Sequence, residues 1–169
     1  MQLYTCTGME KNIIADTPDY PLLAKSLAAL LEGERDFVAN AANFSAFVFN
    51  GLPKLNWAGF YMLRGEELVL GPFQGKPACV RLKKPRGVCW ASALKGETVV
   101  VDDVHCFDGH IACDSNSVSE LVLPVKRNGE VVAVFDVDSP VSSRFGKEDR
   151  AGFEKLVSVF ETSADLSRL

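Results

Sequence analysis

The spacing of apolar residues divides the chain into a first part with helical periodicity and a second part with mainly strand-like runs. Between residues 20 and 32, leucines recur at steps of three and four, which predicts a helix with one buried face, and Gly33 is suited to end it. Asp36 is placed to cap a second helix, which Gly51 ends. Both helices precede the first segment with strand character, so the sequence predicts that the fold opens with helices.

From residue 56 the pattern changes to short alternating or continuous apolar runs, which are typical of β-strands. Strands are predicted at residues 56–64, 67–70, 78–82, 98–101, 120–126 and 131–137. Asn128-Gly129, between the last two, is a dipeptide favoured in tight hairpins. A short helix is predicted at 87–94 and a final helix after Phe145, whereas 102–116 shows no period.

This order of elements predicts an α+β fold, with an antiparallel sheet and with the N- and C-terminal helices packed on one face. The other face of the sheet is then free to carry a pocket. The length fits a single domain, which we expect at residues 16–169, after a loosely ordered N-terminus at 1–15.

The charge balance argues against two classes of partner. The formal net charge is −4, and the one basic cluster, between Arg81 and Arg86, has the pattern of a solvated loop. No apolar stretch approaches the ~20 residues of a membrane span, and no secretory signal pattern opens the chain. We therefore expect a cytoplasmic protein that binds neither nucleic acid nor membrane.

The five cysteines are the first candidates for chemistry. Their odd number, without a secretory signal, argues against a disulfide framework and leaves core filler, metal ligand or redox-active thiol as their uses. Cys89 stands at the predicted start of a helix, where aligned N–H groups favour a thiolate. Cys113 stands in the irregular segment 102–116, where a thiol is more exposed than in a strand, and Cys79 falls in a predicted strand.

Metal binding is a competing use of the irregular segment. His105, Cys106, His110 and Cys113 could supply two nitrogens and two sulfurs to a zinc ion. Their spacing differs from common zinc patterns, and the adjacent His105 and Cys106 fit poorly around one ion. We therefore expect no metal site.

Three carboxylates are predicted near one end of the last hairpin. Asp136 and Asp138 are two apart in a strand and share a face, opposite to Phe135 and Val137. The face of Glu120 depends on the turn: a two-residue loop sets it opposite Val137, and a three-residue loop sets it opposite Asp136. In the second register, repulsion and burial would raise at least one pKa, so the cluster could hold an ammonium group or protonate a leaving oxygen. A solvated strand end is the alternative.

An aromatic pair lies on the first predicted strand. Trp57 and Tyr61, four apart, share a face with Gly59 between them. An aromatic wall with a gap suits a small ligand, and simple core packing is the alternative.

Several motifs occur in a fixed order along the chain. They are Trp57-Ala58-Gly59-Phe60-Tyr61, Gly71-Pro72-Phe73-Gln74-Gly75-Lys76-Pro77-Ala78-Cys79, Gly87-Val88-Cys89, Asp103-Val104-His105, Phe107-Asp108-Gly109-His110-Ile111-Ala112-Cys113-Asp114, Ser119-Glu120-Leu121-Val122-Leu123-Pro124 and Asp136-Val137-Asp138-Ser139. Together they resemble the free methionine-(R)-sulfoxide reductases. The similarity covers about residues 20–160, and motifs in register are more specific than any one alone.

The resemblance implies a GAF fold and a redox mechanism. It implies that Cys113 is the catalytic cysteine, that Cys79 is its main resolving partner and that Cys89 is an alternative partner. The family's substrate-site residues match Trp57, Tyr61, Glu120, Asp136 and Asp138. The implied reaction is reduction of free L-methionine-(R)-sulfoxide through a sulfenic acid and an intramolecular disulfide, with recycling by a thioredoxin-like dithiol protein and without a bound cofactor.

Some points stay open at the level of the sequence. Trp90 stands where the family commonly has a small residue, and Cys106, close to Cys113, leaves open which thiol resolves the intermediate. The rival function is a non-catalytic GAF sensor of a small ligand such as a cyclic nucleotide, which has no need for three placed cysteines. The oligomeric state, with a homodimer as one alternative, and the physiological reductant are not fixed by these patterns.

Overall fold

The computed structural model of the chain describes residues 18–107, 109, 115–167 and 169. Among these residues the helices are α1 (Tyr20–Leu30), α2 (Phe37–Gly51), α3 (Val88–Lys95) and α4 (Lys147–Ser163), with a short 3-10 helix η1 (Val104–Cys106). The strands are β1 (Trp57–Arg64), β2 (Glu67–Gly75), β3 (Arg81–Lys83), β4 (Val99–Val101), β5 (Ser119–Arg127) and β6 (Glu130–Ser139). The predicted N-terminal segment 1–15 and Cys113 lie outside the described residues.

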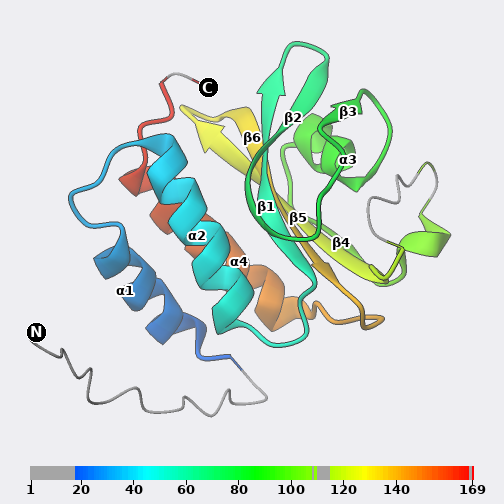
Figure 1. Cartoon of the computed structure of the whole chain (residues 1–169), viewed down its shortest axis with the longest axis horizontal. Coiled ribbons are helices and arrows are strands. Elements are labelled where there is room, and N and C mark those ends of the chain that lie inside the picture. Colours follow the sequence, from blue (N-terminus) through cyan, green and yellow to red (C-terminus); the bar gives the residue numbers. More distant parts are fainter. Residues whose placement is uncertain (1–17, 108, 110–114, 168) are drawn as a thin grey trace, which may run out of the picture.

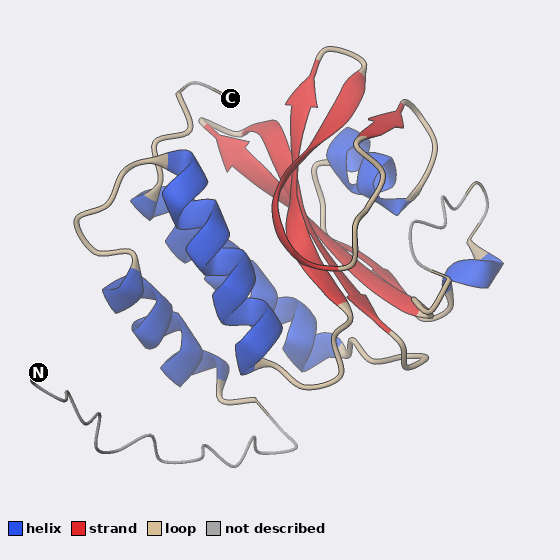
Figure 2. Cartoon of the chain, viewed as in Figure 1, coloured by secondary structure: helices blue, strands red, loops and turns tan. Residues whose placement is uncertain are grey.

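The strands form one antiparallel sheet in the order β3-β2-β1-β6-β5-β4. Helices α1, α2 and α4 lie on one side of this sheet, and α3 lies on the other (Figure 1). Figure 2 shows the same arrangement as a layer of helices beside the curled sheet. The α+β architecture, with the N- and C-terminal helices on one face, is the predicted one.

A phenylalanine core joins the helix layer to the sheet. Phe44 of α2 and Phe160 of α4 pack against Phe60 and Phe135 of the sheet, and all four are fully buried. Their ring centroids lie 4.7 to 5.5 Å apart in tilted or edge-to-face pairs. Because side chains alternate along a strand, burying Phe135 toward the helices directs Asp136 to the opposite face.

The caps explain where the first two helices begin. Asp36 Oδ1 accepts a hydrogen bond from the Ala39 N–H at 2.9 Å, which confirms the predicted cap. Asp19 does the same for the Leu22 N–H at 2.9 Å. Among the described residues, no helix is both long and apolar enough to span a bilayer.

The hairpin between β5 and β6 turns over Asn128 and Gly129, as predicted. Their φ angles are 53° and 87°, and a two-residue turn of this kind requires positive values at both positions. Arg127 pairs with Glu130 across the turn. Such a turn alone would direct Glu120 toward the core.

A β-bulge beside the turn corrects both predicted registers. One extra residue, Val132, stands in β6. Beyond it Glu120 pairs with Asp138, so the predicted pairings with Val137 and with Asp136 are both wrong. The extra residue moves Glu120 onto the face of the two aspartates, and the predicted convergence of three carboxylates is reached by a different route.

Two other strands differ from prediction. β2 continues past Leu70 to Gly75, through Gly71 and Pro72, which normally interrupt strands. β3 pairs only with the start of β2, so Pro72 lies where β2 has no neighbour on that side and a missing N–H is tolerated. The predicted strand at 78–82 is β3 at Arg81–Lys83 instead, which leaves Cys79 in the loop before it.

Candidate active site

The three predicted carboxylates come together on the sheet face opposite the helix layer. Glu120 pairs with Asp138 between β5 and β6, and β1 places Gly59 opposite Asp136 on the other side of β6. Only 6% of Glu120 and 7% of Asp136 is exposed, so the cluster is not a solvated strand end. Asp138 is half-buried beside them.

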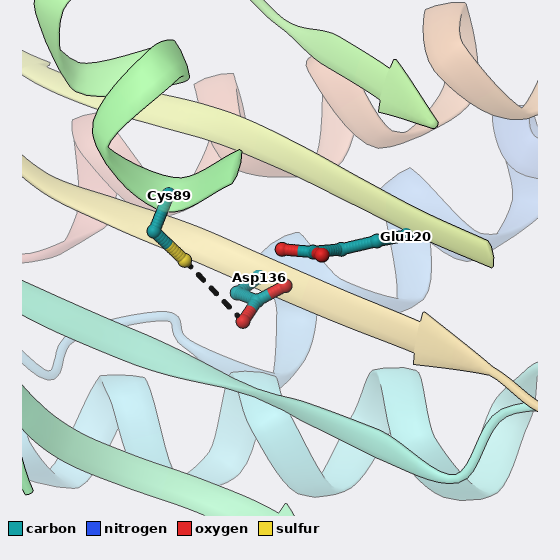
Figure 3. Close-up of side chains that lie close together, drawn as sticks. All are labelled: Cys89, Glu120 and Asp136. Carbon is teal, nitrogen blue, oxygen red and sulfur yellow. Dashed lines mark hydrogen bonds between the residues drawn. The ribbon is translucent and has the colours of Figure 1, made fainter. Parts of the chain in front are cut away.

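Hydrogen bonds tie this cluster to α3. The Cys89 thiol donates to Asp136 Oδ2 with an Sγ–Oδ2 distance of 3.4 Å (Figure 3). Glu120 and Asp136 also share a hydrogen bond, which two carboxyl groups can form only when one of them is protonated. The other Asp136 oxygen, Oδ1, is buried and has no hydrogen-bond partner among the described residues.

The acids differ in how readily they ionise. Burial raises the pKa of Glu120 well above its usual range, and the charges of Asp136 and Asp138 raise it further. Burial raises the pKa of Asp136 to about 7, while hydrogen bonds from Cys89, Glu120 and the Val137 N–H act in the opposite direction. Both carboxyl groups therefore keep a proton to higher pH than exposed carboxyl groups do, and Glu120 has the larger number of causes that raise its pKa.

Cys89 is not the thiolate that its position at the start of a helix favours. It lies in the first turn of α3, but it is only 4% exposed. Burial raises the pKa of its thiol, and the nearby charges of Asp136, Glu120 and Asp138 raise it further. These effects outweigh the helix N-terminus, so Cys89 is a protonated hydrogen-bond donor at neutral pH.

The predicted aromatic pair forms one side of the site. The Trp57 ring stacks on Phe73, with centroids 5.4 Å apart, and on Tyr61, with centroids 5.8 Å apart. Trp57 Nε1 donates to the Lys76 carbonyl at 3.2 Å, and the Tyr61 hydroxyl donates to the Cys79 carbonyl at 3.1 Å. The aromatic wall therefore also fixes the loop that carries Cys79.

The gap predicted at Gly59 is not open space. A Cβ atom there would collide with the Trp57 ring and with Phe73. The absence of a side chain lets the Trp57 ring lie against Gly59, which pairs with Asp136 of β6.

Acids, aromatics and α3 surround one cavity. It is lined by Trp57, Tyr61, Lys76, Pro77, Ala78, Leu82, Gly87, Val88, Cys89, Ser117, Glu120, Asp136 and Asp138. All five predicted substrate-site residues are in this set, and so is Cys89. A polar end and an aromatic side in one cavity are typical of a site for a small amphipathic molecule.

The remaining cysteines have different positions. Cys79 is half-buried and follows Ala78, which lines the cavity. Cys106 is exposed in η1. Cys113 lies outside the described residues, but in the sequence it precedes the cavity-lining Ser117 by four positions.

Sequence reasoning missed some residues of the site. Ser117 lines the cavity and accepts a hydrogen bond from Asn56 Nδ2 at 2.9 Å. Phe73 belongs to the motif that ends at Cys79, and only its stacking on Trp57 reveals its role. Neither has a local pattern that distinguishes it from a loop or strand residue.

Among the described residues, one group of side chains has the spacing of a metal site. Cys89, Glu120 and Asp136 each bring one ligand atom to within 4.8 Å of the others. The thiol and carboxyl protons already satisfy these atoms through the hydrogen bonds above, and an ion would have to displace them. Of the four residues considered above as zinc ligands, His110 and Cys113 lie outside the described residues.

Comparisons with known proteins agree on the type of domain. A family model described as GAF domain matches residues 25–163. The free methionine-R-sulfoxide reductase of Escherichia coli is 47% identical over 145 residues, 86% of this chain and 88% of that protein. The enzyme of that name from Saccharomyces cerevisiae is 38% identical over 149 residues, 83% of each chain. The solved structure of free methionine-R-sulfoxide reductase from Neisseria meningitidis in complex with its substrate is 38% identical, with a TM-score of 0.84, and covers 88% of this chain and 90% of its own.

Proposed function

The chain belongs to the GAF-domain family of free methionine-R-sulfoxide reductases, which are oxidoreductases, and from this premise we propose that it reduces free methionine-(R)-sulfoxide to methionine. The observation that carries the proposal is the convergence of Glu120, Asp136 and Asp138 beside Trp57 in one cavity. A free amino acid presents an ammonium group, a carboxylate and an apolar sulfur-bearing end, and this cavity offers partners for the first and the last.

The ammonium group is the part of the substrate that the cluster suits best. Asp136 Oδ1 is a buried acceptor without a partner among the described residues, and an N–H donor would satisfy it. The Trp57 ring, held in its stack, offers an apolar surface to the S-methyl group. Methionine within a peptide has no ammonium group, so a site built in this way disfavours it.

The first chemical step transfers oxygen from one sulfur to another. The Cys113 thiolate attacks the sulfoxide sulfur while the acid cluster supplies a proton to the sulfoxide oxygen. This attack forms a sulfur–sulfur bond to the protonated sulfoxide. That bond and the sulfur–oxygen bond of the substrate then break as the hydroxyl group moves to the Cys113 sulfur, so methionine leaves and Cys113 becomes a sulfenic acid. Glu120, whose pKa burial raises, is a carboxyl group that keeps a proton at neutral pH.

The later steps return the cysteine to its reduced form. The Cys79 thiol attacks the sulfenic sulfur, a disulfide forms between Cys79 and Cys113, and water leaves. A thioredoxin-like dithiol protein then reduces this disulfide by exchange and becomes oxidised itself. The half-buried Cys79, in a loop beside the cavity, is a more accessible thiol for this exchange than Cys89.

The rival function, sensing of a cyclic nucleotide, fits the cavity less well. A cyclic nucleotide carries a phosphate anion, and three carboxyl groups line this cavity. An ionised Asp136 would repel the phosphate in a place that water screens poorly.

The test is a coupled assay with NADPH, thioredoxin reductase and thioredoxin. Separate reactions contain the R epimer of free methionine sulfoxide, the S epimer, and a peptide with oxidised methionine. We expect NADPH oxidation with the free R epimer alone. No turnover by folded, fully reduced protein, together with micromolar binding of a cyclic nucleotide, would favour the sensor.

A further inference from the structure

We infer that Cys89 is a positioning residue for substrate binding: its thiol hydrogen bond holds Asp136 so that one carboxylate oxygen stays free for the substrate ammonium group. The inference rests on the proposed function, and it gives Cys89 a different role from the alternative redox partner that the resemblance implies.

The geometry separates the two oxygens of Asp136. Oδ2 accepts the Cys89 thiol hydrogen bond at 3.4 Å, whereas Oδ1 has no partner among the described residues. Without the bond to Oδ2, only the hydrogen bonds from Glu120 and the Val137 N–H, together with packing, would restrain rotation about the last side-chain torsion. The thiol therefore acts on the substrate through Asp136 and not by contact with the reacting atoms.

The start of α3 is anchored well enough to serve as a fixed donor. Trp90, the next residue after Cys89, is 2% exposed, and its Nε1 donates to the Leu82 carbonyl at 2.9 Å. The Lys84 ammonium lies 5.8 Å from the centre of the Trp90 ring. Trp90, the departure from the family pattern, thus ties α3 to β3 and keeps Cys89 against β6.

A redox role suits Cys89 less well than the positioning of Asp136. Disulfide exchange needs a thiolate and access to the attacking sulfur. Cys89 is 4% exposed, and it faces three carboxyl groups that oppose its ionisation.

Loss of the Cys89 hydrogen bond should change the pKa of Asp136 in one definite direction. The groups around its carboxyl are Glu120 from β5, Asp138 from its own strand and Cys89 from α3, while β1 contributes the uncharged Gly59 opposite it. The ionisable side chains that line the same cavity also include Lys76 and Tyr61. Since the Cys89 hydrogen bond favours the ionised form, its loss raises the pKa of Asp136 above about 7.

Three substitutions separate the alternatives. Cys89→Ser keeps a donor, Cys89→Ala removes the donor and leaves a small cavity, and Cys89→Val removes the donor and keeps most of the volume. We expect KM for free methionine-(R)-sulfoxide at pH 7 to rise about tenfold in the alanine and valine variants and to stay within about threefold of wild type in the serine variant, because a hydrogen bond to a charged group is what differs. In the alanine and valine variants, KM should begin to rise at a higher pH than in wild type as the pH is lowered.

Each other outcome overturns the inference. If serine behaves like alanine and multiple turnover stops, Cys89 is a redox thiol. If valine behaves like wild type and alanine does not, Cys89 only fills space.

A second measurement does not depend on turnover. In wild-type protein and Cys89→Val, each with ¹³C-labelled aspartate, the Asp136 carboxyl is titrated by NMR, with Asp136→Asn to assign its signal. A titration midpoint that moves upward in Cys89→Val supports the positioning role even if the coupled assay shows no reductase activity, and an unchanged midpoint overturns it.

Discussion

Asp136 is the residue at which substrate binding and stability conflict. An ammonium group needs an ionised carboxylate, but only 7% of Asp136 is exposed, and burial raises its pKa to about 7. Hydrogen bonds from Cys89 and Glu120 reduce the cost of the charge without removing it. An ionised Asp136, which the proposed function requires, therefore costs folding stability.

The first prediction concerns pH. We expect KM for free methionine-(R)-sulfoxide to rise about tenfold as pH falls from 8 to 6, because the ionised fraction of a group with a pKa near 7 falls by about that factor. The coupled assay, with each coupling enzyme in excess at every pH, measures it. Asp136→Asn, which cannot ionise, should give a KM that is high and nearly independent of pH. A constant wild-type KM would contradict the binding role of Asp136.

The second prediction concerns stability. We expect Asp136→Asn to raise the free energy of unfolding at pH 8 by about 1–3 kcal/mol while it lowers activity at least tenfold. The unfolded chain releases this proton near pH 4, whereas the folded protein holds it until about pH 7, so the wild type loses stability between these values. Urea unfolding followed by circular dichroism at pH 4 and pH 8 measures the effect. The difference between the two proteins should nearly vanish at pH 4, and a difference of equal size at both pH values would point to packing.

The third prediction assigns the sulfur chemistry. We expect Cys113→Ser to abolish turnover, and Cys79→Ser to release about one methionine per protein and then stop, because the sulfenic acid lacks its partner. Quantifying methionine from fully reduced protein, with and without the reducing system, measures both. Cys106→Ser is the matched control and should keep multiple turnover. Loss of turnover in that variant would identify Cys106 as the resolving thiol.

At the level of elements, the close approach of β1 and β2 places the aromatic wall. Gly59 faces Phe73 across the two strands, and the Trp57 ring lies over it. This contact fixes where the wall stands relative to the acids on β6.

The fourth prediction tests this contact. We expect Gly59→Ala to cost about 1–3 kcal/mol in unfolding free energy and to raise KM several-fold, because the added methyl group displaces Trp57 from beside the acids. Urea unfolding and the coupled assay measure the two effects. Gly51→Ala, at the last residue of α2 with open space around it, is the control and should change neither. Equal behaviour of the two variants would show that the wall tolerates movement.

The alternation of side chains predicted much of this arrangement. It correctly placed Asp136 and Asp138 on one face and Phe135 on the other, since a period of two depends only on neighbouring residues. The bulge at Val132 was missed because an extra valine in an apolar strand has no local signature.

The environment of Cys89 could not be predicted from its neighbours in sequence. The start of α3 favours a thiolate when it is considered alone. The opposite result arises first from burial of the thiol and then from Asp136 and Glu120, 47 and 31 positions further along the chain, which the fold brings against it. Long-range charges of this kind become visible only when the sheet is assembled.

At the scale of the molecule, the sheet separates two sets of residues. The helix layer and the phenylalanine core lie on one side, and the cavity lies on the other. Within the helix layer, Asp149 at the start of α4 accepts hydrogen bonds from the Tyr20 hydroxyl of α1 at 2.6 Å and from Arg144 Nη1 at 2.9 Å. Burial alone would raise the pKa of Asp149, but these bonds and one from the Gly146 N–H lower it below its usual range.

The fifth prediction uses this network. We expect Asp149→Ala to lower the free energy of unfolding by about 2–4 kcal/mol and to leave KM unchanged, because it breaks a largely buried ion pair of α4, which lies on the side of the sheet opposite the cavity. The wild type should lose the contribution of Asp149 as pH falls below about 4, since its pKa is lowered in the folded state. Urea unfolding and the coupled assay measure both. Arg150→Ala, which breaks the exposed Arg150–Glu154 pair, is the control and should cost less than about 1 kcal/mol. A changed KM in Asp149→Ala would show that the two faces are coupled.

The position of Asp136 within the sheet has a kinetic consequence. β6 has a strand paired on each side, β1 and β5, so its backbone is among the last to open when the protein fluctuates. Cys79, by contrast, lies in a loop between the edge strand β3 and β2. In a catalytic cycle that makes and breaks a disulfide, amide exchange would change with redox state around Cys79, while the amides beside the acids would remain protected throughout. The acids that we propose to bind the substrate thus lie in a better protected part of the fold than the loop that carries Cys79.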